Sequence, residues 1–165
     1  YLEIAAIVCD IDDNKCDVCN SKARDLLNNN HIEFDIVDRV CYIVEHFDEQ
    51  PGNLKLAYHR QRILVMITRD KLLNYGIKTT QDGDDIFIDN KKLSVSIATA
   101  SISSMKMHFA LNITTEGTPV DVETSALEDN GMTIDDIHKL QDEISEAYIE
   151  MIETIDKDIT KTKVF

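Results

Sequence analysis

The sequence predicts an α+β fold, because segments with the apolar period of packed helices occur together with segments that alternate like strands. The helical period of about 3.6 residues is clearest over residues 54–74 and again after Thr133, whereas the period of 2 begins after Gly83. A chain of 165 residues is long enough to bury a sizeable core. We expect residues 1–165 to form a single domain. This domain is either whole or lacks an N-terminal segment. The second alternative arises because the sequence starts at Tyr1 and not at a methionine.

The charge balance is strongly acidic, with 17 Lys and Arg against 31 Asp and Glu and a net charge of −14. Such a surface repels phosphate backbones and anionic membranes, so we expect neither nucleic acid nor membrane as a partner. The sequence has no apolar run of about 18 residues and no signal-peptide pattern at its start, which predicts a cytoplasmic protein.

The first part of the chain is predicted to form a strand, a turn and a helix. Leu2–Cys9 is a short apolar run suited to a buried strand, and Asp10–Asn14 is rich in turn residues, which indicates a hairpin. Residues 21–48 have a helical pattern in which Asp35 is a candidate cap, and Pro51-Gly52 ends it. The apolar positions of this pattern are Ile36, Val37, Val40, Tyr42, Ile43, Val44 and Phe47.

The cysteines allow a metal site but do not require one. Cys16 and Cys19 have the spacing of half a zinc site or a redox pair, but neither a second such pair nor a close pair of histidines accompanies them. Free cysteines are usually buried in a core of this size, so we expect Cys9, Cys16, Cys19 and Cys41 to be structural and no metal to be bound.

A second helix is predicted over Leu54–Asn74, with Gly76 as its stop signal. His59, Arg60 and Arg62 give this helix a local basic patch. In an acidic protein such a patch either binds an anion or pairs with neighbouring carboxylates, and we favour pairing.

The stretch GDDIFIDNKKLSVS, residues 83–96, predicts a hairpin with its turn at Asn90-Lys91. This register gives one continuous apolar face, formed by Ile86, Ile88, Leu93, Val95 and Ile97. The opposite face then holds Asp85, Phe87, Asp89, Lys92, Ser94 and Ser96. Lys92 would lie across from Asp89, so it either forms a cross-strand ion pair or leans over a binding site.

The next predicted strand, Ser104–Thr114, alternates as regularly. Its core face is formed by Met105, Met107, Phe109, Leu111 and Ile113. Its other face carries His108 and Asn112, which we expect to join Ser94, Ser96, Ala98 and Ala100 in a floor of small and polar side chains. Such a floor either supports a ligand or meets water.

An acidic loop is predicted over Pro119–Asn130. Asp121 and Glu123 in this loop could share a strand face and bind a hard cation, but a chance pairing is favoured in so acidic a chain.

A capping box at Thr133–Asp136 opens a long final helix, and its lysine-rich end suits the helix dipole. The apolar stripe of this helix is more consistent with core than with an oligomerisation seam, although its length permits a homo-oligomer. That stripe consists of Ile137, Leu140, Ile144, Ala147, Met151 and Ile155.

Several segments resemble known families. HRQRIL, DDIFIDNKKLSVSIAT, MHFALNIT, GTPVDVE and DKDITKTK together resemble an archaeal family known as domain of unknown function 366. More distantly, residues 76–112 resemble the core of biotin protein ligases and lipoate ligases, which share a fold with class II aminoacyl-tRNA synthetases. This resemblance implies a largely antiparallel sheet flanked by helices.

The ligase resemblance also implies a site. Asp84-Asp85, Lys91-Lys92, Ser94 and Asn112 occupy places that correspond to the ligase pattern, and Lys92 is the counterpart of the lysine that contacts the activated carboxylate. A lysine ammonium there would offset charge that develops as an acyl-adenylate forms, and a nearby carboxylate could hold Mg²⁺. ATP and Mg²⁺ are therefore cofactors by resemblance alone. If the chain is an enzyme, the resemblance implies a ligase or an acyltransferase.

One ligase feature is absent, because no Gly-Arg-Gly-type loop precedes the hairpin. Two hypotheses remain. In the first, a small carboxylate or acyl group binds beside Lys92, with Asp85, Ser94, Ser96, His108, Asn112, Arg60 and Arg62 as further ligand-binding residues. In the second, the ligase-like fold serves as a non-catalytic binding or assembly module.

Overall fold

The computed structural model describes residues 2–9 and 39–162. In chain order the elements are β1 (Leu2–Cys9), β2 (Arg39–His46), α2 (Leu54–Asn74), β3 (Thr80–Asp82), β4 (Asp85–Ile88), β5 (Lys91–Lys92), β6 (Ser94–Ala100), β7 (Met105–Asn112), the 3-10 turn η2 (Glu128–Asn130) and α3 (Ile134–Ile159). The strand predicted over Leu2–Cys9 is confirmed. The predicted turn at residues 10–14, residues 21–38 of the first predicted helix, and Cys16 and Cys19 lie outside the described residues. No helix in the described ranges is long and apolar enough to cross a membrane.

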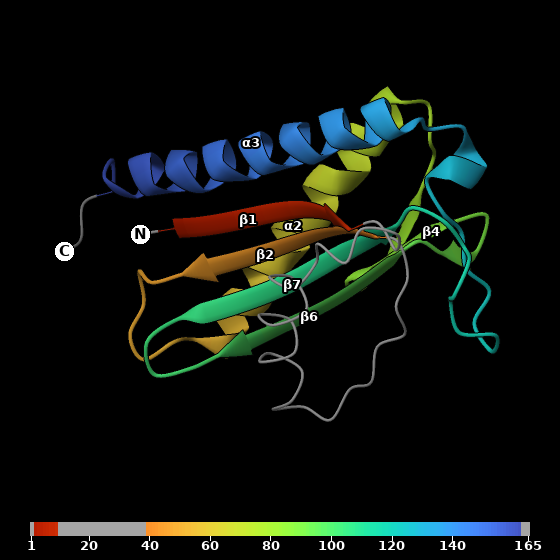
Figure 1. Ribbon diagram of the computed structural model, residues 1–165. Coiled ribbons are helices and arrows are strands. Elements are labelled where there is room, and N and C mark those ends of the chain that lie inside the picture. The colour runs from red at the N-terminus through yellow and green to blue at the C-terminus, as the bar shows by residue number, and fades with distance from the viewer. Residues whose placement is uncertain (1, 10–38, 163–165) are drawn as a thin grey trace.

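The main sheet has the strand order β1-β2-β7-β6, and all of its neighbouring strands are antiparallel. Helix α2 crosses behind this sheet, and α3 runs along its β1 edge (Figure 1). A smaller antiparallel sheet, β3-β4-β5, lies at one end of the main sheet. The predicted α+β fold, with largely antiparallel strands and flanking helices, is confirmed.

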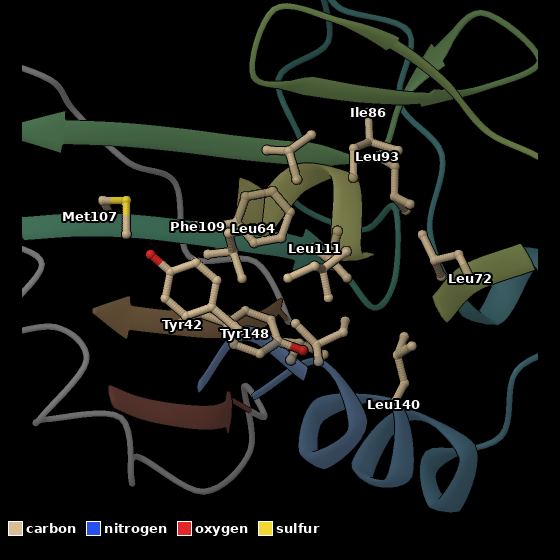
Figure 2. Packing of buried hydrophobic residues seen from close by; sticks show 14 of the residues in the cluster. Tyr42, Leu64, Leu72, Ile86, Leu93, Met107, Phe109, Leu111, Leu140 and Tyr148 are labelled. Atoms are coloured by element: carbon tan, nitrogen blue, oxygen red, sulfur yellow. The ribbon is translucent and has the colours of Figure 1, made fainter. Parts of the chain in front are cut away.

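The main core fills the space between the sheet and the two helices. Side chains from β2 and β7 meet side chains from α2 and α3 there (Figure 2). The largest of these fully buried side chains include Tyr42, Phe109, Leu111, Leu64, Leu72, Leu140 and Tyr148. The core face predicted for β7 is confirmed, since Met105, Met107, Phe109, Leu111 and Ile113 are all buried.

The helix predicted up to Asp48 is wrong over Arg39–His46, which forms the strand β2. Val40, Tyr42 and Val44 belong to the main core, whereas Cys41 and Ile43 belong to a second apolar cluster with Ala110. Because both sets of alternating residues are buried, the sequence is an unbroken apolar run with no period that distinguishes a strand from a helix.

The two long helices begin where local signals place them. Asn53 caps α2 by accepting a hydrogen bond from the Leu56 amide at 3.1 Å, and Gly76 follows its end with φ +79°. Thr133 and Asp136 form the predicted capping box of α3. The predicted stripe of α3 is buried at Ile137, Leu140 and Ile144, and the buried surface continues through Tyr148 and Ile152. Met151 and Ile155, which were predicted as core, are 43% and 38% exposed.

The hairpin turn lies at Asp89-Asn90, one residue earlier than predicted. These two residues have φ values of 49° and 65°, as a two-residue hairpin of type I′ requires, and Asp and Asn tolerate that conformation better than Lys. Lys92 therefore lies opposite Phe87 and not opposite Asp89, so the predicted Asp89–Lys92 pair is not formed.

The predicted floor is also wrong, because β6 and β7 present its residues on opposite faces of the main sheet. Ser94 and Ser96 pair with Leu111 and Phe109 on the face that α2 covers, whereas His108 pairs with Ile97 on the other face. The alternation changes phase where the chain passes from β5 to β6, since Leu93 and Ser94 are both buried there. The apolar face predicted to continue through Val95 and Ile97 therefore ends at Leu93.

Candidate functional site

Lys92 is the residue on which the predicted ligand site depends, and its partner is Asp85. The ammonium Nζ lies 2.8 Å from Oδ2 of Asp85, and the two side chains are 32% and 28% exposed. Asp85 is two residues before Phe87, the cross-strand neighbour of Lys92, so the pair is a diagonal one on the same face of the small sheet. The Lys92 ammonium is thus partly open to solvent and held by a carboxylate on one side.

The main chain of β5 is fixed from the side opposite β4. The Lys92 amide donates to the Glu123 carbonyl at 2.8 Å, and the Ser125 amide donates to the Lys92 carbonyl at 2.9 Å. The buried amide of Asn112 donates to the carbonyls of Ser125, at 3.1 Å, and Lys92, at 3.4 Å. The structure therefore brings together Lys92, Asp85 and Asn112, although Asn112 contacts the backbone rather than the ammonium.

Ser94, Ser96 and Arg62 do not lie beside the Lys92 ammonium. They lie between the strands and helix α2. The Ser94 hydroxyl accepts from the Ile86 amide at 2.8 Å and is buried. Nε2 of Gln61 donates to the Ser96 hydroxyl at 2.6 Å and to Oδ2 of Asp84 at 3.1 Å. These bonds make the two serines part of the internal support of the strands.

Gln61 is a member of this network that was not predicted from the sequence. It is fully buried on α2, and Arg62 donates to its Oε1 at 3.0 Å while pairing with Asp84 at 3.3 Å. The available signal was a polar residue among the apolar positions of a predicted helix, beside the basic patch. Gln61 and Arg62, both on α2, together hold the Asp84 carboxylate.

Arg60 lies in a second polar cluster, between the end of β2 and α3. Its guanidinium donates to both carboxylate oxygens of Asp48, at 2.8 and 2.5 Å, and this hydrogen bonding lowers the pKa of Asp48 to about 2. The Tyr148 hydroxyl lies 2.9 Å from Nε2 of His46, whose pKa is lowered to about 4 by burial and by the Arg60 charge. Burial raises the pKa of Tyr148. The prediction that the basic patch pairs with carboxylates is confirmed for Arg60 and Arg62.

His108 is separated from Lys92. It is buried on the face of β7 that does not meet α2, and burial, with a smaller effect of Arg39, lowers its pKa to about 4. With this pKa, the imidazole is neutral near pH 7. His108 is also four residues of strand, about 13 Å, from Asn112.

Further carboxylates lie on the segments next to the Lys92–Asp85 pair. Asp82 is exposed on β3, Asp89 in the hairpin turn and Glu123 on the segment beside β5. In the described part of the chain, no group of three or more His, Cys, Asp or Glu side chains is arranged to hold a metal ion. Chemically, the arrangement offers an ammonium donor on a rigid strand, with an anion beside it.

A sequence model described as Domain of unknown function (DUF366) matches residues 6–163. The chain belongs to the DUF366 family. This DUF366 chain is 41% identical over 125 residues to the uncharacterized protein MJ0805 of Methanocaldococcus jannaschii, a match that covers 76% of the chain and 54% of MJ0805. It therefore spans about half the length of that relative. A protein of unknown function from Pyrococcus horikoshi has a solved structure that matches with a TM-score of 0.74 and 31% identity, covering 99% of this chain and 81% of that one.

The fold of the DUF366 chain is also that of biotin and lipoate ligases. A biotin protein ligase from Aquifex aeolicus, solved in complex with biotin and ATP, matches with a TM-score of 0.54 and 17% identity, covering 70% of this chain and 52% of that one. The candidate lipoate protein ligase Ta0514 from T. acidophilum, solved with bound lipoic acid, matches with a TM-score of 0.54 and 12% identity, covering 76% of this chain and 62% of that one. The ligase-like fold predicted from residues 76–112 is confirmed.

Proposed function

We propose that this DUF366 chain binds a small carboxylate or acyl group beside Lys92, at the exposed face of β4 and β5. If the chain is an enzyme, its activity is transfer of that acyl group, as in a ligase or acyltransferase. The observation that carries the proposal is the position of the Lys92 ammonium. It is partly exposed on a strand whose backbone is bonded to neighbouring segments on both sides, in a fold shared with proteins solved with biotin or lipoic acid.

The rigid backbone supports this proposal. A binding residue is effective when its support is fixed before the ligand arrives, because less conformational entropy is then lost on binding. Asp85 orients the ammonium from one side, and Asn112 fixes the Ser125 and Lys92 carbonyls from beneath. Lys92 thus meets the requirement for a preorganised hydrogen-bond donor to a carbonyl oxygen.

The other residues predicted to bind the ligand do not contact it in the proposal. Ser94, Ser96 and Arg62 support the strands from within, and Arg60 and His108 lie in other clusters. We therefore restrict the proposed contact residues to Lys92 and Asp85.

ATP and Mg²⁺ are not part of the proposal. Arg60 and Arg62, two cations predicted to contact a ligand, are paired with Asp48 and Asp84. Among the described residues, no group of three or more His, Cys, Asp or Glu side chains is arranged to hold a metal ion.

Thermal unfolding in the presence of biotin, lipoate and octanoate, each as the free acid and as its amide, tests the proposal. A ligand at 100 times its Kd stabilises the folded state by about 2.7 kcal/mol, which raises Tm by about 5 to 10 °C for a domain of this size. We expect at least one acyl group to give such a shift in the wild type and in K91M, and K92M to lose most of it.

Lys91 is the matched control, because it is the adjacent lysine, is exposed and lies on the opposite face of the same strand. Unchanged Tm with all of these compounds would refute the proposal. Equal shifts in K92M and the wild type would refute it as well.

The alternative function, a non-catalytic assembly module, is favoured by one observation. Met151, Ile155 and Ile159 expose 43%, 38% and 63% of their surfaces along one side of α3. Such a continuous apolar stripe on a helix is suited to self-association. Sedimentation velocity on the wild type and on I155K tests this alternative, which requires a wild-type oligomer that I155K dissociates.

A further inference from the structure

We propose that Asp85 is a specificity-determining residue that selects an uncharged acyl derivative, such as an ester, a thioester or an amide, over the free carboxylate. This inference rests on the proposed function of Lys92 and specifies the chemical class of its ligand. It is based on the 2.8 Å contact between Nζ of Lys92 and Oδ2 of Asp85.

The ion pair leaves donors but little net charge. An ammonium group has three N–H donors, and Asp85 occupies one direction. An acyl carbonyl oxygen can accept from a second N–H without disturbing the pair. A free carboxylate at the same position would be attracted by the ammonium, but it would also lie within about 5 Å of the Asp85 carboxylate, and this repulsion cancels much of the attraction. The attraction that is left does not repay the cost of desolvating a charged ligand, a cost that an uncharged acyl group does not carry.

The other charged groups near the hairpin do not restore this attraction. Arg62, near the start of the hairpin, is paired with Asp84, and Arg69 donates a hydrogen bond to Gln81 on β3. Between residues 82 and 92 the chain carries four aspartates against two lysines, and Glu123 is exposed on the adjoining segment. The site is therefore negative around a cation that is already compensated.

Asp84 and Asp85 have different roles in this arrangement, although they are adjacent in the sequence. Gln61 and Arg62 hold the Asp84 carboxylate from the α2 side, whereas Asp85 contacts the Lys92 ammonium. Of the two carboxylates, Asp85 is thus the one beside the position that a ligand of Lys92 would occupy.

Matched pairs of compounds test the inference directly. Octanoate and octanamide share one chain and nearly one shape, and lipoate and lipoamide do the same, so each pair isolates the charge. We expect titration calorimetry at pH 7 to give at least about 10-fold tighter binding of the amide to the wild type. In D85N we expect the preference to disappear or to reverse, since Asn keeps the side-chain shape without the charge.

Asp89 provides the control for the charge change. It lies exposed in the turn of the same hairpin, its φ of 49° suits Asn, and its predicted pair with Lys92 is not formed. D89N should therefore keep the wild-type preference, and circular dichroism of both variants checks their folding.

Acids and amides that bind the wild type equally well, or an acid-to-amide ratio that D85N leaves unchanged, would overturn the role of Asp85 and leave the proposed function standing. If none of these four compounds, and neither biotin nor its amide, binds to the wild type or to D85N, both the inference and the proposed function are refuted.

Discussion

The buried pair of His46 and Tyr148 makes stability depend on pH, and substitution of His46 by Gln measures that dependence. Folding lowers the pKa of His46 from 6.5 to about 4, so between these pH values the unfolded chain binds a proton that the folded protein does not. Protons therefore favour unfolding. The free energy of unfolding falls as the pH drops from about 6.5 toward 4, and it levels off below the folded pKa.

The size of the effect follows from the shift. A difference of 2.5 pKa units at about 1.4 kcal/mol per unit corresponds to about 3 kcal/mol, with a slope of up to about 1.4 kcal/mol per pH unit. Since His46 is only 2% exposed, solvent screens little of this effect. Gln retains a hydrogen-bond acceptor for Tyr148 but does not titrate, so H46Q should lose the His46 part of the slope.

Urea unfolding followed by circular dichroism at pH 7, 6, 5 and 4.5 gives the slopes of the wild type and H46Q. H138Q serves as the control for the His-to-Gln change itself, because His138 is exposed on α3. His108 contributes its own slope in all three proteins, so the comparison isolates His46. Identical slopes for H46Q and the wild type would show that folding does not hold His46 neutral.

Four further substitutions test the packing and the cap of α3, each by urea unfolding at pH 7. L64A should lower the free energy of unfolding by about 2 to 5 kcal/mol, because Leu64 is 1% exposed. M66A is the control on the same helix, since Met66 is 56% exposed, and it should change that free energy by less than about 0.5 kcal/mol. Similar losses in the two variants would contradict the assigned core. T133A should cost about 1 kcal/mol by removing the capping box of α3, and an unchanged stability would mean that the cap is not formed in solution. G52A should destabilise the protein by at least about 1 kcal/mol, since the new Cβ would lie 2.6 Å from the Ser101 carbonyl oxygen, and a neutral result would contradict this close approach.

Local signals were sufficient for α2 and α3, but not for the helix predicted up to Asp48. The bounds of α2 match the prediction because its apolar period and Gly76 mark them in the sequence, and the alternation of β7 identified its core face. Strand β2 was missed because its residues are buried on both faces, which removes the period from the sequence. The hairpin turn was misplaced by one residue although the Asp89-Asn90 pair carried the signal for it.

The site was harder to predict, because its composition depends on register between distant strands. Lys92 and Asp85 were identified from one hairpin, but the partner of Lys92 changed when the turn moved. Whether Ser96 faces His108 is decided by the pairing of β6 with β7, which no local pattern contains. Gln61 joined the network only because α2 crosses beneath β6.

The backbone bonds of Lys92 have a consequence for any attempt to isolate this region. Strand β5 is two residues long, and the backbone of Lys92 forms hydrogen bonds with Glu123 and Ser125. The side-chain amide of Asn112 donates a further hydrogen bond to the Ser125 carbonyl. A synthetic peptide of residues 83–96 would carry the whole lysine motif without these supports, and short hairpins are at best marginally stable in water. Transplanting the motif into another scaffold should therefore require the distant segment as well, because the ammonium owes its position to residues about 30 places further along the chain.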